Sequence, residues 1–146
     1  QIKWENRLKG DKGKTAKVCV DGTDFRVCMN EAFAKQFNSH KFKGCSALRY
    51  EVATCIQTGD IVWTSGPWLP GVYNDVGVYR KSGLKKKLKK AKEKGEADDG
   101  YLGELGTIRH PSVMQSEEDY RAKAKVRKRH ETVNGRLKKF KCLKNY

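Results

Sequence analysis

The sequence has little proline and no long apolar segment. It contains 3 prolines in 146 residues, and charged residues interrupt each hydrophobic stretch before it is long enough to cross a bilayer. No apolar segment follows the basic N-terminus, as one would in a secretory signal peptide. These absences exclude a membrane-spanning helix and favour a soluble intracellular protein with no membrane partner.

Cysteine pairs with metal-binding spacing are also absent. The 5 cysteines are scattered, none at CxxC spacing, and the 3 histidines lie far from any cysteine pair. A zinc site is therefore not expected. The odd number of cysteines argues against a disulfide framework, so reduced thiols, half-buried in strands, are the simplest interpretation.

Negative charge is scarce. The 17 acidic residues face 32 lysines and arginines, which gives a net charge of +15. A chain this basic repels itself unless a polyanion neutralises it, and nucleic acid is the usual partner, with an anionic membrane second. The hydrophobic share of 37% suits one modest core and one domain. The chain begins with Gln rather than Met, so we expect a fragment or a processed product.

The first third of the chain predicts one strand and an irregular segment. Residues 1–16 are polar and charged and are expected to form a leader. Residues 16–23 place valines around a cysteine and end in Asp-Gly, which predicts a short buried strand that ends in a turn. Residues 25–29 either extend this strand or start a second one. Residues 30–47 predict an irregular excursion or a short helix.

A hairpin and a helix follow. Residues 48–57 and 61–67 alternate apolar and polar positions around a Gly-containing turn, which predicts a β-hairpin. Asn74 or Asp75 is a suitable cap for a helix that begins at about residue 76, and Gly83 is expected to interrupt it.

The last third is mostly helical in pattern. Residues 83–95 place leucines and an alanine on one helical stripe among lysines. Residues 96–104 predict a brief strand that ends in a turn, and residues 103–119 a loop. Residues 117–143 return to a long helical pattern. Strands first, then alternating strand and helix, predict an α/β fold with a mixed sheet.

Three acidic residues stand at the ends of these elements. Asp21 ends the first strand, Asp98 ends the brief late strand, and Glu131 lies on the late basic helix. Phosphoryl transfer with two divalent metals needs carboxylates from separate elements that converge on closely spaced ions. Carboxylates suit the hard Mg²⁺ ion, and surrounding cations keep them ionised. The three residues are therefore candidate ligands of a phosphodiester-cleaving site.

Several motifs, taken in order, resemble the catalytic domain of Harbinger-like DDE transposases. They read VDGTDF, LRYEVATCIQTGDIVW, NDVGVYR, ADDGYLGE and RHETVNGRLKKF, and the likeness covers roughly residues 17–143. The resemblance implies an RNase H-like fold, a mixed β-sheet flanked by helices, over residues 17–146. It also implies that Asp21, Asp98 and Glu131 are catalytic and hold two Mg²⁺ or Mn²⁺ ions.

The identity of the second acid stays open at this stage. Asp75 matches a recurring Asp of the family, and it is either a residue beside the metals, counted among the metal-site residues, or the second acid itself. The ADDGY motif also leaves open whether Asp98 or Asp99 points at the metal.

Two basic stretches are candidate phosphate-binding tracks. Charge runs are most often solvated helix faces, but these contain too few acidic residues for that to be the favoured interpretation. We expect contacts to DNA phosphates, without base specificity, from Lys85, Lys86, Lys87, Lys89, Lys90, Arg121, Lys123, Lys125, Arg127, Lys128 and Arg129.

Three further side chains have a structural and a functional interpretation. Trp63 and Trp68 suit core packing or a hairpin lid better than stacking on a flipped base. His130 is expected to be a helix-surface histidine rather than a residue that orients phosphate or water.

The predicted function is metal-dependent DNA cleavage and strand transfer by a nuclear transposase. A homodimer and a separate DNA-binding subunit are expected partners, since no helix-turn-helix or zinc-finger module is evident in the sequence. The alternatives are a domesticated, non-catalytic DNA-binding relic of a transposase and a basic RNA-binding protein.

Overall fold

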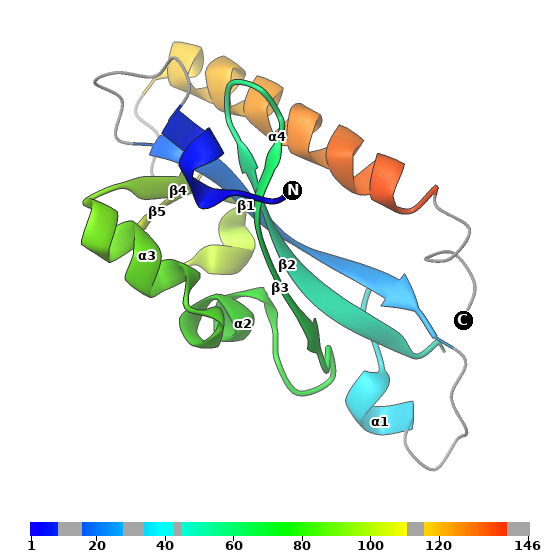
Figure 1. The fold of residues 1–146 in the computed structure, drawn as a ribbon. Helices are drawn as coiled ribbons and strands as arrows, with labels where there is room; N and C mark the ends of the chain where they lie inside the picture. The colour runs from blue at the N-terminus through cyan, green and yellow to red at the C-terminus, as the bar shows by residue number, and fades with distance from the viewer. Residues whose placement is uncertain (9–15, 28–33, 43–44, 111–115, 140–146) are drawn as a thin grey trace.

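A mixed β-sheet forms the centre of the protein. The computed structural model describes residues 1–8, 16–27, 34–42, 45–110 and 116–139, apart from the side chains of residues 34, 119, 122 and 123. Its five strands are β1 (Ala16–Arg26), β2 (Ala47–Cys55), β3 (Ile61–Trp68), β4 (Lys94–Glu96) and β5 (Ile108–Arg109). They lie in the order β3-β2-β1-β4-β5 (Figure 1). The β1–β2 and β2–β3 pairs are antiparallel, whereas β1–β4 and β4–β5 are parallel.

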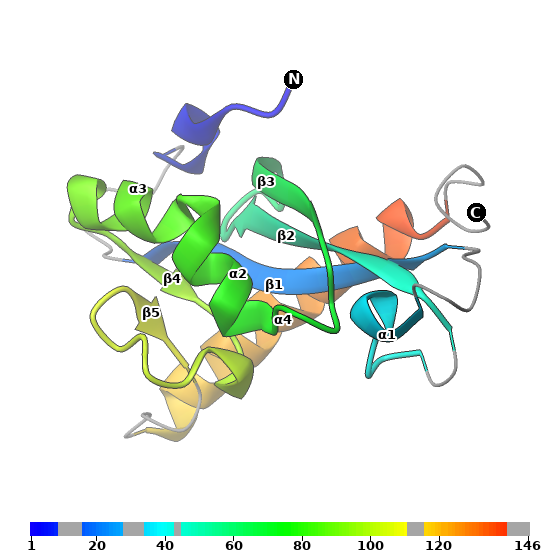
Figure 2. The ribbon, with the colours of Figure 1, turned by 90° about the horizontal axis from the view of Figure 1, so that it is seen from below.

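Helices cover both faces of this sheet. They are η1 (Trp4–Leu8), α1 (Ala34–Phe37), α2 (Asp75–Ser82), α3 (Leu84–Ala91), η3 (Asp99–Tyr101) and α4 (Glu117–Leu137). Figures 1 and 2 show the α2–α3 pair and α4 on either side of the sheet. This arrangement confirms the predicted α/β class and is consistent with the expected RNase H-like fold.

Alternation along β1 sends its side chains to two different layers. Val18 and Val20 enter the hydrophobic core with Leu84 and Leu88, because successive residues of a strand point to opposite faces. Cys19 and Asp21 therefore point to the α4 face. The strand thus contributes to the core on one side and to a polar pocket on the other.

Most predicted elements are confirmed, with shifted ends. The first strand continues through residue 26, so the turn predicted at its Asp-Gly is wrong and Asp21 lies within β1, paired with Val52, rather than at its end. The hairpin and the short helix after it are present. Gly83 does interrupt the helical segment: its φ of 96° closes α2 and opens α3. The late strand already begins at Lys94, two residues earlier than predicted.

Two predictions in the last third were wrong in detail. Residues 108–109, expected in a loop, form β5, a two-residue strand with no local pattern that pairs with β4. The last helix ends at Leu137 rather than 143, and residues 140–146 lie outside the described residues.

Part of the polar leader packs against the sheet. The Trp4 ring meets Trp63 edge-on at a centroid distance of 6.4 Å. Arg7 is buried, and its Nε donates to Glu93 Oε2 at 2.8 Å. These contacts join η1 to β3 and to the residue before β4.

The described cysteines and helices agree with two sequence-based expectations. Cys19, Cys45 and Cys55 are free thiols, and burial raises the pKa of Cys19 well above its ordinary value. In the part of the chain that the structure describes, no helix is both long and apolar enough to span a bilayer.

Candidate active site

One pocket lies between the centre of the sheet and α4. It has a volume of about 160 Å³ and is open to solvent on one side. Its wall is formed by Cys19, Val20, Asp21, Asp98, Arg127, His130 and Glu131. The structure therefore brings the three acids singled out in the sequence to the same pocket, from three separate elements.

The sheet register places the first two acids side by side. In the parallel β1–β4 pair, Cys19 is the partner of Glu96. Asp21 and Asp98 each stand two residues beyond this pair, so both are found at the same end of adjacent chain segments. Asp98 caps η3, and its Oδ1 accepts a hydrogen bond of 3.0 Å from the Gly100 N–H.

The third acid comes from one face of α4. Arg127, His130 and Glu131 are spaced three and four residues apart, which puts them on the same side of a helix. Asn134, one turn further, donates from Nδ2 to Asp21 Oδ2 at 3.1 Å. This hydrogen bond ties the helix to the first acid.

The charge of Asp21 is disfavoured by its surroundings. Burial raises its pKa to about 6, and the charges of Asp75 and Asp98 add to this rise, while Lys41 opposes it. Lys41 lies close by, because its Nζ donates to the Gly22 carbonyl at 2.7 Å. A buried carboxylate close to other carboxylates forms an environment in which a bound cation is stabilising.

Asp75 lies next to the pocket and not among the residues that line it. It begins α2, and its Oδ1 is 3.2 Å from Arg49 Nη1. The same oxygen touches the backbone of Gly22, since a Cβ on that residue would lie 2.1 Å away. Asp99 points elsewhere: its Oδ1 is 3.7 Å from His110 Nδ1. Of the three candidates for the second acid, Asp98 alone lines the pocket.

The carboxylates of Asp21, Asp98 and Glu131 are suitable ligands for a divalent metal ion, but they do not converge on one point in the structure. Carboxylate oxygens are the ligands that Mg²⁺ and Mn²⁺ prefer. Among the described residues, however, no group of three or more His, Cys, Asp or Glu side chains is close enough to hold a metal ion.

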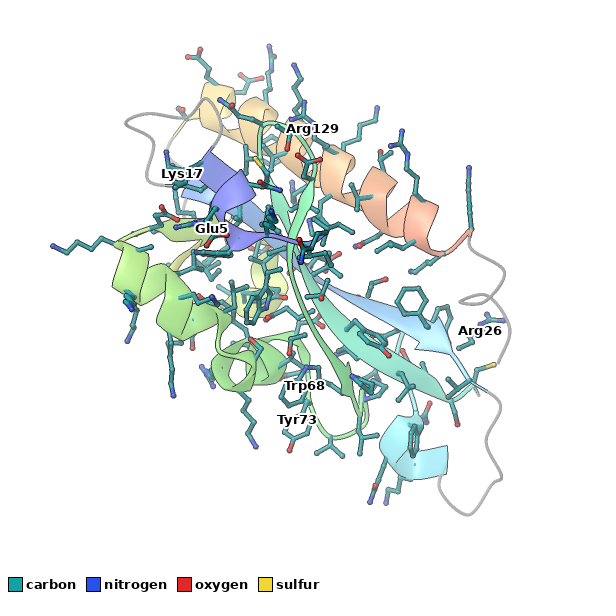
Figure 3. The ribbon with its side chains drawn as sticks, in the orientation of Figure 1. Glu5, Lys17, Arg26, Trp68, Tyr73 and Arg129 are labelled. Carbon is teal, nitrogen blue, oxygen red and sulfur yellow. The ribbon has the colours of Figure 1, made fainter. Side chains whose placement is uncertain are left out.

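Of the described basic residues of α4, Arg127 lines the pocket, whereas Lys125 and Arg129 line a second hollow beside Ile56 and Gln57. Within the described part of the chain, the buried Nε of Arg127 makes no hydrogen bond. Arg129 donates to the carbonyls of Ile56 and Gln57 and so joins α4 to the β2–β3 turn (Figure 3). Arg121 pairs with Glu117 at 2.8 Å. Lys125 and Lys128 are exposed, and the side chain of Lys123 is outside the described set.

The lysines of α3 lie on the opposite face of the sheet from the pocket. Lys85 pairs with Glu104 at 2.7 Å, and the Nζ of Lys87 is within 5.6 Å of the ring centroids of Trp4 and Trp63. The exposed lysines of this helix without a recorded partner are Lys86, Lys89 and Lys90. The two basic stretches therefore do not form one continuous track through the pocket.

His130 differs from its prediction as a helix-surface residue. It is 2% exposed, and its Nδ1 lies 2.9 Å from Thr54 Oγ1. Burial lowers its pKa to about 4, so the ring is neutral at pH 7. The pattern of apolar residues along α4 does not predict this burial, because the residues that cover His130 belong to β2.

The two tryptophans have structural roles, in line with the favoured interpretation. Trp63 packs against the core and donates from Nε1 to Glu51 Oε1 at 3.0 Å. Trp68 donates to Ser65 and meets Tyr73 edge-on (Figure 3).

Sequence reasoning missed three residues that contact the candidate acids or the backbone beside them: Asn134 contacts Asp21, Lys41 contacts Gly22, and Arg49 contacts Asp75. Each acts through a partner far away in the sequence, so no local motif marks it.

The chain was compared with known protein families and structures. The family described as DDE superfamily endonuclease matches over residues 20–146. No curated protein matches the chain. No solved structure matches it either.

Proposed function

This chain belongs to the DDE superfamily endonucleases, and we propose that it is a Harbinger-like transposase core that cleaves DNA and transfers the cut strand. Family membership supports nuclease- or transposase-type activity in general. The observation that supports the finer proposal is the pocket that Asp21 of β1, Asp98 after β4 and Glu131 of α4 line together.

Each side chain of the pocket has a role in this scheme. Asp21, Asp98 and Glu131 would hold two Mg²⁺ or Mn²⁺ ions, and Asp75 adds negative charge beside them. When bound, these ions supply activation of the attacking hydroxyl and neutralisation of the leaving oxygen. Arg127, whose Nε has no recorded hydrogen bond, is placed to contact a phosphate in the same pocket.

The DNA path in this proposal follows α4. Lys125 and Lys128 are exposed on this helix and would contact phosphates, which position a duplex without reading its sequence. The lysines of α3 would contact a separate stretch of DNA on the opposite face. A homodimer, a separate DNA-binding subunit and nuclear localisation belong to the same proposal.

The alternative is a transposase relic that binds DNA without cutting it. Such a relic would have the same fold and surface charge. It is favoured by the observation that, among the described residues, no three carboxylate, histidine or cysteine side chains lie close enough together to hold a metal ion. An RNA-binding protein is the second alternative, because the same cations would contact RNA phosphates.

Substitution of Asp21 tests the proposal. Asp21→Asn should abolish Mg²⁺- or Mn²⁺-dependent nicking of supercoiled DNA, because it removes a metal ligand. DNA affinity should stay equal or rise slightly, since a negative charge beside phosphate is lost. Glu118→Gln, an equal charge change at an exposed position on α4, is the matched control and should cut normally.

Two outcomes would contradict parts of the proposal. Nicking that survives Asp21→Asn means that Asp21 is not a metal ligand. If the unsubstituted chain binds DNA but cuts it with neither Mg²⁺ nor Mn²⁺, the protein is the non-catalytic DNA-binding relic. If it binds RNA in preference to DNA, it is the RNA-binding protein.

A further inference from the structure

A buried ion pair lies behind the pocket. Asp24 of β1 and Arg49 of β2 are cross-strand partners, with side chains 0% and 6% exposed. Arg49 donates from Nε and Nη2 to the two oxygens of Asp24 at 2.8 and 2.9 Å. Ser39 also donates to Asp24. Burial alone would raise the pKa of Asp24, but the hydrogen bonds from Arg49 and Ser39 outweigh it and hold the pKa below its ordinary value. Both members are therefore charged.

The same guanidinium reaches the start of α2. Its remaining nitrogen, Nη1, donates to the Tyr73 carbonyl at 3.2 Å and lies 3.2 Å from Asp75 Oδ1. The planar fork of Arg engages three groups at once, which the single point charge of Lys does not do in the same geometry. Arg49 thus joins the first two strands to the first residue of α2.

Asp75 is held where two chain segments leave no room for a side chain. A Cβ on Gly22 would lie 2.1 Å from Asp75 Oδ1, and a Cβ on Gly100 would lie 3.9 Å from Asp75 Oδ2. Gly22 follows Asp21, and Gly100 donates its N–H to Asp98. The Asp75 carboxylate is therefore packed between the backbone segments that carry the first two acids.

The contacts of Arg49 connect the ion pair to the residues beside the pocket. Asp24 engages Nε and Nη2 of Arg49, and the remaining nitrogen, Nη1, lies 3.2 Å from Asp75 Oδ1. Buried pairs are weak contributors to stability, because desolvation offsets most of their attraction. A buried arginine with three partners is better explained by the geometry that it imposes.

We propose that Arg49, anchored by Asp24, is a positioning residue that holds Asp75 against Gly22 and so sets Asp21 and Asp98 for a shared divalent cation. This inference rests on the proposed function and deepens it. Residues that orient metal ligands from outside typically change metal affinity 10- to 100-fold when substituted. Arg49 itself contacts neither metal nor DNA in this scheme.

The test is Mn²⁺ binding measured by electron paramagnetic resonance on the full chain, beside nicking activity. Arg49→Lys keeps the charge and loses the fork, and should weaken Mn²⁺ binding about 10-fold. Arg7→Lys makes the same change in the Arg7–Glu93 pair, which is also buried but remote from the pocket. This control should lose comparable thermal stability and bind Mn²⁺ normally.

A second variant guards against simple misfolding. Gly22→Ala leaves Asp24 and Arg49 intact and displaces Asp75, so it should weaken Mn²⁺ binding to a similar extent. The double variant Asp75→Asn with Arg49→Lys should bind Mn²⁺ as tightly as the single variant that binds it less well. The two effects should not add, because both substitutions break the same contact.

The failure of this inference differs from that of the proposed function. If the unsubstituted chain binds Mn²⁺ and both Arg49→Lys and Gly22→Ala bind it equally well, the positioning role is wrong and the metal site stands. If the unsubstituted chain binds no Mn²⁺, the proposed function fails, and the positioning role fails with it.

Discussion

At the scale of single residues, Glu51 is a buried acid that the pocket does not use. It is 1% exposed and lies on β2, where Trp63 donates to it. Burial raises its pKa to about 7, against the effect of hydrogen bonds from Ser82 and Trp63, and Asp75 adds to the rise. The folded protein therefore holds a proton on Glu51 that the unfolded chain releases near pH 4.5.

This shift predicts a pH-dependent stability. The pKa of Glu51 is higher in the folded than in the unfolded protein. Its contribution to the unfolding free energy is therefore fully present below about pH 4.5 and is lost as the pH rises through about 7. Glu51→Gln keeps an acceptor for Trp63 and removes the titration. We expect the variant to exceed the unsubstituted chain by up to about 3 kcal/mol in unfolding free energy at pH 8. Urea unfolding of both proteins from pH 4 to 8 measures the difference, and parallel curves would contradict the assignment.

At the scale of elements, the α2–α3 junction decides how the acids and the core are arranged. Gly83 adopts φ 96°, ends α2 and starts α3. The turn lets α2 place Asp75 beside Gly22 while α3 directs Leu84 and Leu88 into the core. A continuous helix would not satisfy both packing requirements.

The junction predicts a cost for any side chain at this glycine. Gly83→Ala should lower the unfolding free energy by about 1 kcal/mol, because L-residues are strained in the left-handed region. The strain is conformational, since the nearest atom to an added Cβ is Trp63 Cη2 at 4.0 Å. Gly106→Ala is the matched control: its Cβ would meet nothing within 4 Å, and its φ is outside that region. Equal denaturant midpoints for the two variants would contradict the prediction.

At the scale of the whole molecule, cations are divided between the two faces of the sheet. Figure 2 shows α3 and α4 on opposite sides of the sheet. The pocket and Arg127 belong to the α4 side, and the exposed Lys86, Lys89 and Lys90 belong to α3. In the proposed DNA path, a short duplex at the pocket would not contact the lysines of α3, which lie on the other side of the sheet. The two faces should therefore bind DNA independently.

This division predicts the stoichiometry of binding. The unsubstituted chain should bind two short duplexes, and Lys86, Lys89 and Lys90 replaced together by Gln should bind one and still cut it. At the site formed by these lysines, the logarithm of DNA affinity should fall with the logarithm of salt concentration by about 0.9 for each phosphate neutralised. Lys125→Gln with Lys128→Gln should instead weaken the site at the pocket. Calorimetric titration distinguishes these results, and unchanged stoichiometry in the α3 variant would mean that its lysines are a solvated face.

The sequence by itself determined the elements that depend on neighbouring residues. The alternation of residues 48–57 and 61–67 predicted the hairpin, and the glycine at 83 predicted the helix break. The polyanionic partner inferred from the charge of +15 stays a prediction. Period, turn chemistry and net charge are local or additive properties, so they can be read without the fold. The ordered acidic motifs also led to the family that the chain belongs to.

Only the tertiary structure decided which side chains meet. β5 exists because β4 pairs with it, and His130 is buried because Thr54 of β2 lies over it. Asp98 rather than Asp75 lines the pocket because the β1–β4 register places Asp98 beside Asp21, whereas Asp75 packs against Gly22 and Arg49. These contacts join residues that are distant in the chain, and their energies depend on burial and geometry that exist only once the sheet and helices have packed.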